Sequence, residues 1–240
     1  MCMPQVSSLR VRRKCLSVSR IGSPPGPVND RTDDPAGYHR PMPFGSDRVA
    51  AVLLAAGASR RFGSPKMLAR LGGEPLVRRV ARSFREAGFG EVAVVLAPGA
   101  DEVAAALDGL GVLLAVNPRP EDGMLSSAQA GLSALSSGCG RIALTPADLP
   151  GLTAPVLRRV LGCLPPPTAA QVAVPECDGR RGHPLVIPAS LAPRVLSWEP
   201  VRRLSDLLGE EDVEVVALPG FGPEVLRDVD VPADLAPALR

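Results

Sequence analysis

Three cationic side chains gather among small residues in one short stretch of the chain. Residues 57–66 read GASRRFGSPK and contain Arg60, Arg61 and Lys66. Small residues let a backbone approach a ligand closely, and free amides and cationic side chains can hold an anion. Lys14 and Lys66 are the only lysines in the sequence, so a lysine here indicates a need for its compact ammonium. The stretch predicts a phosphate-binding loop, with an ordinary strand-to-helix turn as the alternative.

Aspartates follow or end two predicted strands elsewhere in the chain. Asp148 comes shortly after the predicted strand 141–145, and Asp228 and Asp230 alternate with Val229 along the predicted strand 225–229. Carboxylates beside phosphates would repel them unless a cation lay between, which favours a magnesium site. The alternative for Asp148 is a simple Asp-x-Pro turn.

Two further positions have side chains suited to ligand binding. Gly123, Ser126 and Ser127 stand near the start of a predicted helix, where amide and hydroxyl groups would face the crevice of an open sheet. Helix capping alone would also explain them. His183 is one of two histidines and precedes a short apolar run; a structural histidine is the alternative to a substrate-facing one.

The elements that must position these residues alternate regularly from Val49 onward. Short apolar runs predict strands, and amphipathic periodicity predicts the helices between them. The predicted strands are 49–56, 91–97, 112–116, 141–145, 171–175, 183–187, 213–217 and 225–229. The predicted helices are 75–87, 100–107, one that begins within 117–132, 154–163, 189–195 and 201–208. This alternation predicts an α/β fold with a mostly parallel, doubly wound sheet.

The first 48 residues differ in character from the rest. They mix Arg, Pro, Gly and Ser without periodicity, which predicts a disordered N-terminal arm (1–48) before one folded domain (49–240). Met42 lies seven residues before the first predicted strand, so a start site placed too far upstream is a second hypothesis. An intact mass of the native protein would separate the two.

Composition argues against a nucleic-acid-binding protein and against a membrane-spanning protein. The chain has 240 residues, 45% of them hydrophobic, with a net charge of +2 and 3% aromatic residues. Near-neutral charge and few aromatics argue against nucleic-acid binding. No run approaches the ~18 apolar residues of a membrane span, and the five cysteines lack metal-ligand spacing. We expect a cytoplasmic protein with reduced thiols.

Residues 54–68, LAAGASRRFGSPKML, match neither common phosphate-loop pattern. They resemble the signature L-A-A-G-x-S-x-R-[MF]-G-x-x-K-x-L of the MobA-like nucleotidyltransferases at every specified position. The resemblance implies that these residues bind a nucleotide, and that Lys66 and Arg61 act with Asp148 in catalysis. The implied nucleotide-binding residues of this loop are Leu54, Ala55, Ala56, Gly57, Ser59, Arg60, Arg61 and Lys66.

Other segments resemble further motifs of this family. NPRPEDGMLSSAQAGL (117–132) is similar to a segment that holds base and ribose, although Leu125 and Ala128 depart from it. The resemblance assigns Asp148 (D-x-P) and Asp230 (D-[IV]-D-T-P-x-D-L) as Mg²⁺ ligands, with Asp228 as the substitute for Asp230. A glycine-rich G-D-x-G-x-R segment is not matched. The remaining implied contacts are Asn117, Gly123, Ser126 and Ser127 to the nucleotide, and Gly182, His183 and Pro184 to the acceptor.

The resemblance implies a Rossmann-like three-layer αβα fold of the nucleotide-diphospho-sugar transferase type. It also implies Mg²⁺-dependent transfer of a nucleotide from an NTP to a phosphorylated acceptor. Ala55-Ala56-Gly57 and Pro65-Lys66 are similar to the cytidylyltransferase-like branch, so we expect CTP and molybdopterin, with transient contact to a molybdenum enzyme. Alternatives are a non-catalytic insertion chaperone for a molybdenum hydroxylase, another phosphorylated acceptor such as a sugar phosphate, and a glycosyltransferase.

Overall fold

The computed structural model describes residues 48–57, 59, 62–136 and 138–235. Apart from Arg48, the predicted N-terminal arm lies outside the described residues. Arg60 and Arg61, predicted to contact the nucleotide, also lie outside them.

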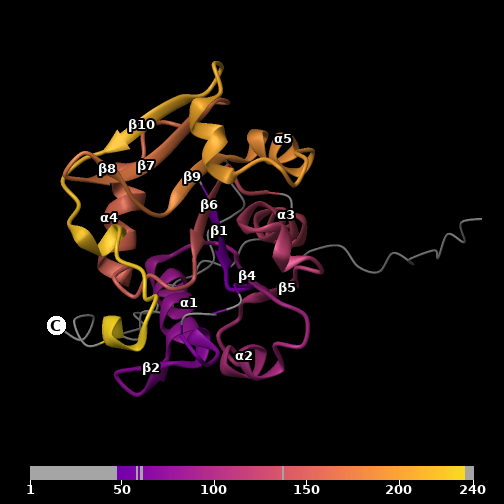
Figure 1. Cartoon of the computed structure of the whole chain (residues 1–240). Helices are drawn as coiled ribbons and strands as arrows, with labels where there is room; N and C mark the ends of the chain where they lie inside the picture. Colours follow the sequence, from indigo (N-terminus) through magenta and orange to yellow (C-terminus); the bar gives the residue numbers. More distant parts are fainter. Residues whose placement is uncertain (1–47, 58, 60–61, 137, 236–240) are drawn as a thin grey trace, which may run out of the picture. The chain divides into compact units, whose positions relative to one another are not determined.

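A mixed, mostly parallel sheet forms the centre of this part of the chain (Figure 1). Its order is β10-β7-β9-β6-β1-β4-β5, with β8 paired to β7. β9 runs antiparallel to β6 and β7, whereas β6, β1, β4 and β5 are mutually parallel. The strands are β1 (Val49–Leu54), β4 (Val92–Leu96), β5 (Leu113–Val116), β6 (Arg141–Pro146), β7 (Gln171–Cys177), β8 (Arg180–Arg181), β9 (Leu185–Pro188) and β10 (Glu214–Leu218).

Helices cover both faces of the sheet, which explains why every residue of β1 is buried. In Figure 1, α1 (Leu76–Ala87) and α4 (Ala154–Cys163) lie to the left of the central strands, and α3 (Met124–Ala134) and α5 (Ala192–Leu196) lie to the right. Leu53 of β1 belongs to the core on the α1 side, and Val52 to the core on the α3 side. The predicted three-layer α/β architecture is confirmed.

Shorter elements complete the chain. α2 (Asp101–Ala106) adds Val103 to the core on the α1 side. A two-stranded hairpin, β2 (Arg70–Leu71) and β3 (Glu74–Pro75), precedes α1 and was not expected from the sequence. The 3₁₀ helices are η1 (Lys66–Leu68), η2 (Pro120–Asp122), η3 (Ala189–Leu191), η4 (Leu204–Gly209), η5 (Pro223–Val225) and η6 (Pro232–Leu235). The predicted helix 201–208 is thus largely the 3₁₀ helix η4.

The predicted strand 225–229 is wrong. Its first residue ends η5, and the following residues join no sheet. Val225 and Val229 are buried in the core, and isolated backbone bonds, not a strand ladder, tie the segment to its neighbours: His183 N donates to Val225 O (2.8 Å) and Val229 N donates to Asp148 O (3.0 Å). The alternating pattern therefore reflects two buried valines in an extended strap, which we call the C-terminal strap (Val225–Asp230).

Free thiols are present on the three described cysteines, Cys139, Cys163 and Cys177. Within the described part of the chain, none of the helices combines the length and apolar character that a bilayer crossing requires.

Candidate active site

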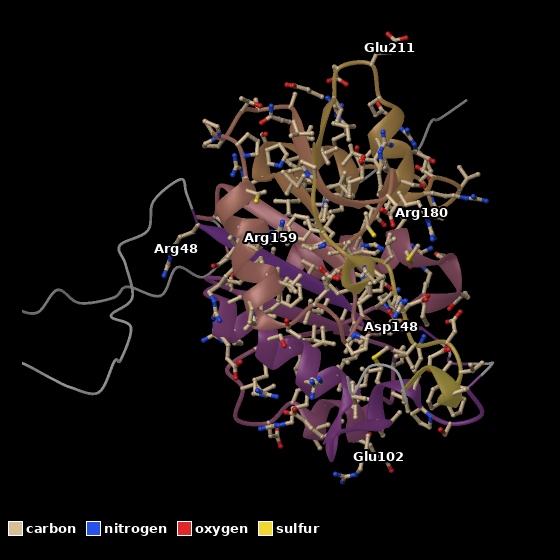
Figure 2. The ribbon with its side chains drawn as sticks, turned by 90° about the vertical axis from the view of Figure 1, so that its left-hand side faces the viewer. Arg48, Glu102, Asp148, Arg159, Arg180 and Glu211 are labelled. Atoms are coloured by element: carbon tan, nitrogen blue, oxygen red, sulfur yellow. The ribbon has the colours of Figure 1, made fainter. Side chains whose placement is uncertain are left out.

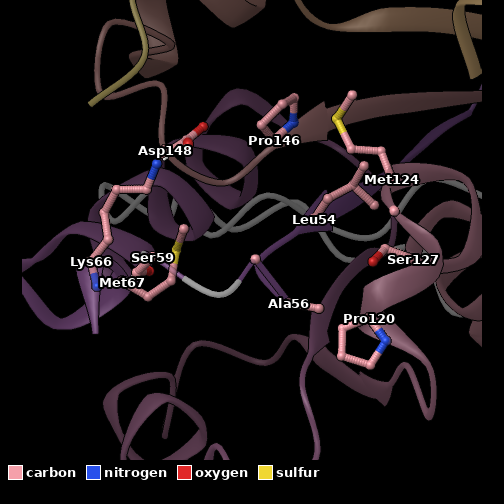
Figure 3. A pocket seen from close by; sticks show the side chains of 12 residues that line it. Leu54, Ala56, Ser59, Lys66, Met67, Pro120, Met124, Ser127, Pro146 and Asp148 are labelled. Carbon is pink, nitrogen blue, oxygen red and sulfur yellow. Dashed lines mark hydrogen bonds and ion pairs between the residues drawn. The ribbon is translucent and has the colours of Figure 1, made fainter. Parts of the chain in front are cut away.

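Three distant segments meet at the carboxyl ends of β1 and β6. Lys66 is the first residue of η1, which follows β1 after a loop, and Asp148 lies two residues beyond β6. Lys66 Nζ lies 2.6 Å from Asp148 Oδ2 and 3.5 Å from Asp230 Oδ1. Figure 3 shows the Lys66 side chain extended to Asp148. The fold thus places the single described lysine among aspartates that are 82 and 164 residues away from it in sequence.

A serine turns the loop so that Lys66 faces this position. Ser59 has a left-handed backbone (φ 48°), which is uncommon for a residue with a side chain. Its Oγ accepts a hydrogen bond from Lys66 N (3.2 Å), and its carbonyl accepts one from Phe62 N (2.9 Å). Met67, the next residue, is buried. The backbone of Lys66 is therefore fixed from both sides, while its side chain reaches the aspartates.

Asp148, Asp228 and Asp230 form the carboxylate cluster. One oxygen from each lies within 4.8 Å of the others. Asp148 Oδ1 is buried and has no hydrogen-bond partner, and such an oxygen is costly unless a ligand satisfies it. An all-oxygen set of carboxylates is the kind of site that Mg²⁺ prefers. The described residues therefore fit a divalent cation, and both strap aspartates, not one alone, lie within reach.

The C-terminal strap is held in place by Asp234. Its Oδ2 accepts hydrogen bonds from Val231 N and Asp230 N, both 2.9 Å. These two bonds lower the pKa of Asp234 below its ordinary value of 3.8. Figure 2 shows Asp148 close to the olive ribbon of the C-terminal segment, in agreement with the bond from Val229 N to Asp148 O. Asp234 thus orients the strap, and the cluster carboxylates project from it.

Gly182 lets the strap pass close to the predicted acceptor segment. A Cβ at this position would lie 2.6 Å from Val225 O, so a larger residue would push the strap away. His183 Nδ1 is buried without a hydrogen-bond partner. Burial lowers the pKa of His183 from 6.5, although Asp148 and Asp228 act in the opposite direction. The structure therefore brings Gly182 against the strap and His183 near Asp148 and Asp228, with a neutral imidazole at neutral pH.

A pocket of about 230 Å³ lies next to the Lys66 ammonium (Figure 3). Among its lining residues are seven that the sequence predicted to bind nucleotide: Leu54, Ala56, Gly57, Ser59, Lys66, Gly123 and Ser127. Sequence reasoning missed four others, Met67, Pro120, Met124 and Pro146. These apolar residues have no reactive group, so nothing in the residue types themselves indicated a place in the pocket wall.

Ala55, Asn117 and Ser126 do not line this pocket. Ala55 lines a neighbouring depression that shares Gly57, Ser59 and Met67 with this pocket. Asn117 is buried, and its Nδ2 donates to Ser126 Oγ (2.9 Å) and Ser127 Oγ (3.0 Å). Ser126 Oγ also lies 2.9 Å from Gly123 O. Asn117 and Ser126 therefore shape the turn into α3, whereas Ser127 both shapes it and faces the pocket.

The unmatched segment between α5 and η4 has its own internal packing. The Arg202 guanidinium lies 3.9 Å from the centroid of the Trp198 ring and pairs with Glu210. Gln129 Nε2 of α3 donates to Trp198 O (2.9 Å). This segment is thus tied to α3, whose first turn lines the pocket.

Comparison with known proteins identifies similar chains. The model of the MobA-like NTP transferase domain matches residues 51–215. A protein named nicotine blue oxidoreductase from Paenarthrobacter nicotinovorans is 36% identical over 154 residues, which cover 62% of this chain and 75% of the relative. A probable molybdenum cofactor guanylyltransferase from Deinococcus radiodurans is 30% identical over 191 residues, 78% of this chain and 92% of the relative.

A solved structure agrees in fold. The homologue of Mycobacterium tuberculosis Rv0371c from Mycobacterium sp. strain JC1 superposes with a TM-score of 0.68 at 26% identity. The superposition covers 80% of this chain and 98% of the other. The matched family domain runs from within β1 to the second residue of β10, so it contains the glycine-rich loop and Asp148 but ends before the C-terminal strap.

Proposed function

The chain belongs to the MobA-like NTP transferase family, and from that premise we propose that it transfers CMP from CTP to molybdopterin with release of pyrophosphate. Nucleotidyl transfer is the chemistry of the family. The base, the acceptor, the magnesium ion and the roles of individual residues are the parts proposed for this chain.

One observation carries the proposal: the Lys66 ammonium lies against a cluster of three carboxylates, and Lys66 and Asp148 line a pocket beside the glycine-rich loop. Phosphoryl and nucleotidyl transfers depend on positioning and on stabilising charge at phosphate oxygens, and they need no covalent intermediate on the protein. A protein that only binds a nucleotide has no need for a complete set of cationic and metal-binding groups. This combination therefore favours an enzyme over a chaperone.

Each residue has a role in the proposed reaction. The triphosphate would lie over Gly57 to Lys66, and Lys66 and Arg61 would stabilise the charge that develops on its phosphates. An acceptor phosphate oxygen would form a bond to the α-phosphorus while the bond to the bridging oxygen of the pyrophosphate breaks. An acceptor phosphate needs no deprotonation at neutral pH, so the neutral His183 would position it together with Gly182 and Pro184.

Magnesium fits the proposed site. Asp148 and Asp230 would hold the ion, with Asp228 within reach, and the unpartnered Asp148 Oδ1 supports this assignment. When bound, the ion neutralises charge on the phosphate oxygens. Carboxylate oxygens suit Mn²⁺ as well as Mg²⁺, so both ions belong in the assay.

The test is pyrophosphate release from each of the four NTPs with molybdopterin and Mg²⁺. We expect release with CTP, and a loss of about 10²–10³-fold or more in Asp148→Asn, because the substitution removes a cluster charge at nearly constant volume. Asp108→Asn, an exposed aspartate away from the pocket, is the matched control and should retain full activity.

Other outcomes would change specific parts of the proposal. Release with GTP alone would move the chain to the specificity named in the Deinococcus relative. Release that requires a sugar phosphate would keep the reaction and change the acceptor. No release with any NTP, despite measurable binding of molybdopterin, would contradict catalysis and favour an insertion chaperone.

The 36% identity to a protein named nicotine blue oxidoreductase raises a second candidate function. In that case the pocket would hold a reduced nicotinamide nucleotide, and a redox-active dye would be the acceptor. Oxidation of NADH or NADPH in the presence of such a dye, unaffected by Asp148→Asn, would favour this candidate. We favour transfer because a hydride donor gains nothing from three clustered carboxylates.

A further inference from the structure

The position of the Lys66 ammonium bears on how a metal reaches the carboxylate cluster. Lys66 Nζ is within 3.5 Å of oxygens from both Asp148 and Asp230. The Lys66 side chain is only 12% exposed. A divalent ion held by these aspartates takes carboxylate oxygens as its ligands at about 2.0–2.6 Å. The ammonium and the ion would therefore compete for the same oxygens.

Charge explains why the ammonium is found there. Three carboxylates whose oxygens lie within 4.8 Å repel one another, and a nearby positive charge offsets that repulsion. The ammonium supplies one positive charge and a divalent ion would supply two. Among the described residues, the Lys66 ammonium pairs with two of these aspartates and so offsets part of their repulsion in the metal-free protein.

We propose that Lys66 is a stand-in cation: it occupies the carboxylate cluster until a divalent ion displaces it, and is then released towards the triphosphate. Its backbone is fixed by the bond to Ser59 Oγ and by the buried Met67, so only its side chain needs to move. A flexible four-carbon stem with a hydrated ammonium suits such a movement better than a planar guanidinium. The second half of this inference, release towards phosphates, rests on the proposed function.

The exchange couples the two ligands. A triphosphate that attracts Lys66 removes the competitor from the cluster, so nucleotide strengthens metal binding, and by reciprocity metal strengthens nucleotide binding. Without nucleotide the metal must displace Lys66 unaided. Wild-type protein should therefore bind a divalent ion weakly on its own and much more tightly with CTP.

Mn²⁺ alone, followed by its electron paramagnetic resonance signal, tests the competition. We expect Lys66→Met to bind Mn²⁺ about 10-fold or more tightly than wild type in the absence of nucleotide, within the usual 5–150-fold range of such couplings. CTP should strengthen Mn²⁺ binding in wild type and much less in Lys66→Met. Equal or weaker Mn²⁺ binding by Lys66→Met without nucleotide would overturn the proposal.

Arg227→Met is the matched control. Arg227 is exposed and adjacent in sequence to Asp228, and its substitution also removes one positive charge from this region. If the loss of any nearby positive charge were enough to tighten Mn²⁺ binding, both variants would bind Mn²⁺ more tightly to a similar extent. We expect a marked increase for Lys66→Met only.

A second measurement uses wild-type protein and does not depend on the folding of a variant. Chemical acylation of lysines, read by mass spectrometry, should label Lys66 several-fold faster with Mn²⁺ than without it, with Lys14 as the internal reference. Unchanged or slower labelling with saturating Mn²⁺ would contradict displacement. The labelling experiment and the nucleotide-free arm of the Mn²⁺ titration stand even if no NTP releases pyrophosphate. Conversely, the wild-type protein could release pyrophosphate normally while Lys66→Met binds Mn²⁺ with the wild-type affinity. That result would contradict this inference and leave the proposed function intact.

Discussion

At the scale of single residues, the Glu74 carboxylate, away from the candidate site, joins two elements through ion pairs. Glu74 of β3 accepts hydrogen bonds from Arg82 Nε (3.1 Å) and Nη2 (2.7 Å). Arg82 also donates to Glu86 (2.9 Å) one turn along α1. The hydrogen bonds from Arg82 lower the pKa of Glu74 below 4.5. This two-point pairing ties the β2–β3 hairpin, which follows Lys66 and η1, to α1.

Glu74→Gln should therefore lower stability in a pH-dependent manner. The Glu74 pKa is lower in the folded than in the unfolded protein, so its contribution is present above pH 4.5 and is lost as the pH falls through the folded-state value. The pair is partly exposed, and we expect a loss of about 1 kcal/mol, or about 2–4 °C in Tm, at pH 7. Thermal unfolding of both proteins from pH 7 into the acid range provides the measurement. A difference in Tm that persists undiminished at acid pH would contradict the assignment.

At the scale of elements, α3 lies unusually close to the sheet. A Cβ on Gly131 would be 2.2 Å from Val52 Cγ1 of β1 and 2.8 Å from Val95 Cγ2 of β4. This close packing fixes the helix whose first turn places Gly123 and Ser127 in the pocket wall. The position of the predicted nucleotide site thus depends on the absence of a side chain at Gly131.

Gly131→Ala should destabilise the fold. Both valines belong to buried strands and cannot move without disturbing the sheet, so overpacking should cost about 1–3 kcal/mol. Gly162→Ala is the control, because Gly162 is also in a helix, α4, but a Cβ there meets nothing within 4 Å. The control should be neutral or stabilise by up to about 1 kcal/mol. Similar Tm values for the two variants would show that α3 can shift away from the sheet.

At the scale of the whole molecule, the described residues of the unit Met42–Arg240 are compact, and the first strand of their sheet begins at Val49. We propose that residues 49–240 form the nucleotidyltransferase domain. The described site draws on no residue before Leu54.

A chain that starts at Met42 should behave as the full chain does. We expect Tm within about 2 °C and pyrophosphate release within about twofold of the 240-residue protein, because every group proposed to act lies in the retained part. Calorimetry and the NTP assay described above provide the two measurements. Loss of activity in a truncated chain of unchanged Tm would mean that residues 1–41 contribute to the site.

The local sequence pattern was enough to predict most helices and strands of the fold and some of the residues that line the pocket. The run Val49–Leu54 and the helix Ala154–Cys163 have strong periodicity and clear boundaries, so neighbouring residues specify them. The loop from Gly57 to Lys66 is predicted to bind phosphate because glycine, hydroxyl and cationic residues are concentrated within it, and Gly57, Ser59 and Lys66 line the pocket. The parts that the sequence determined by itself are those whose causes lie within a few residues.

Only the tertiary structure decided the contacts between distant segments. The alternation around Asp228 and Asp230 resembled a strand, but it arises because Val225 and Val229 are buried in the core while backbone bonds to His183 and Asp148 hold the strap. Likewise, no local pattern could show that the Lys66 ammonium lies among the carboxylates. These contacts join residues 82 and 164 positions apart, and the packing of the sheet and strap, not any neighbouring residue, brings them within hydrogen-bond distance.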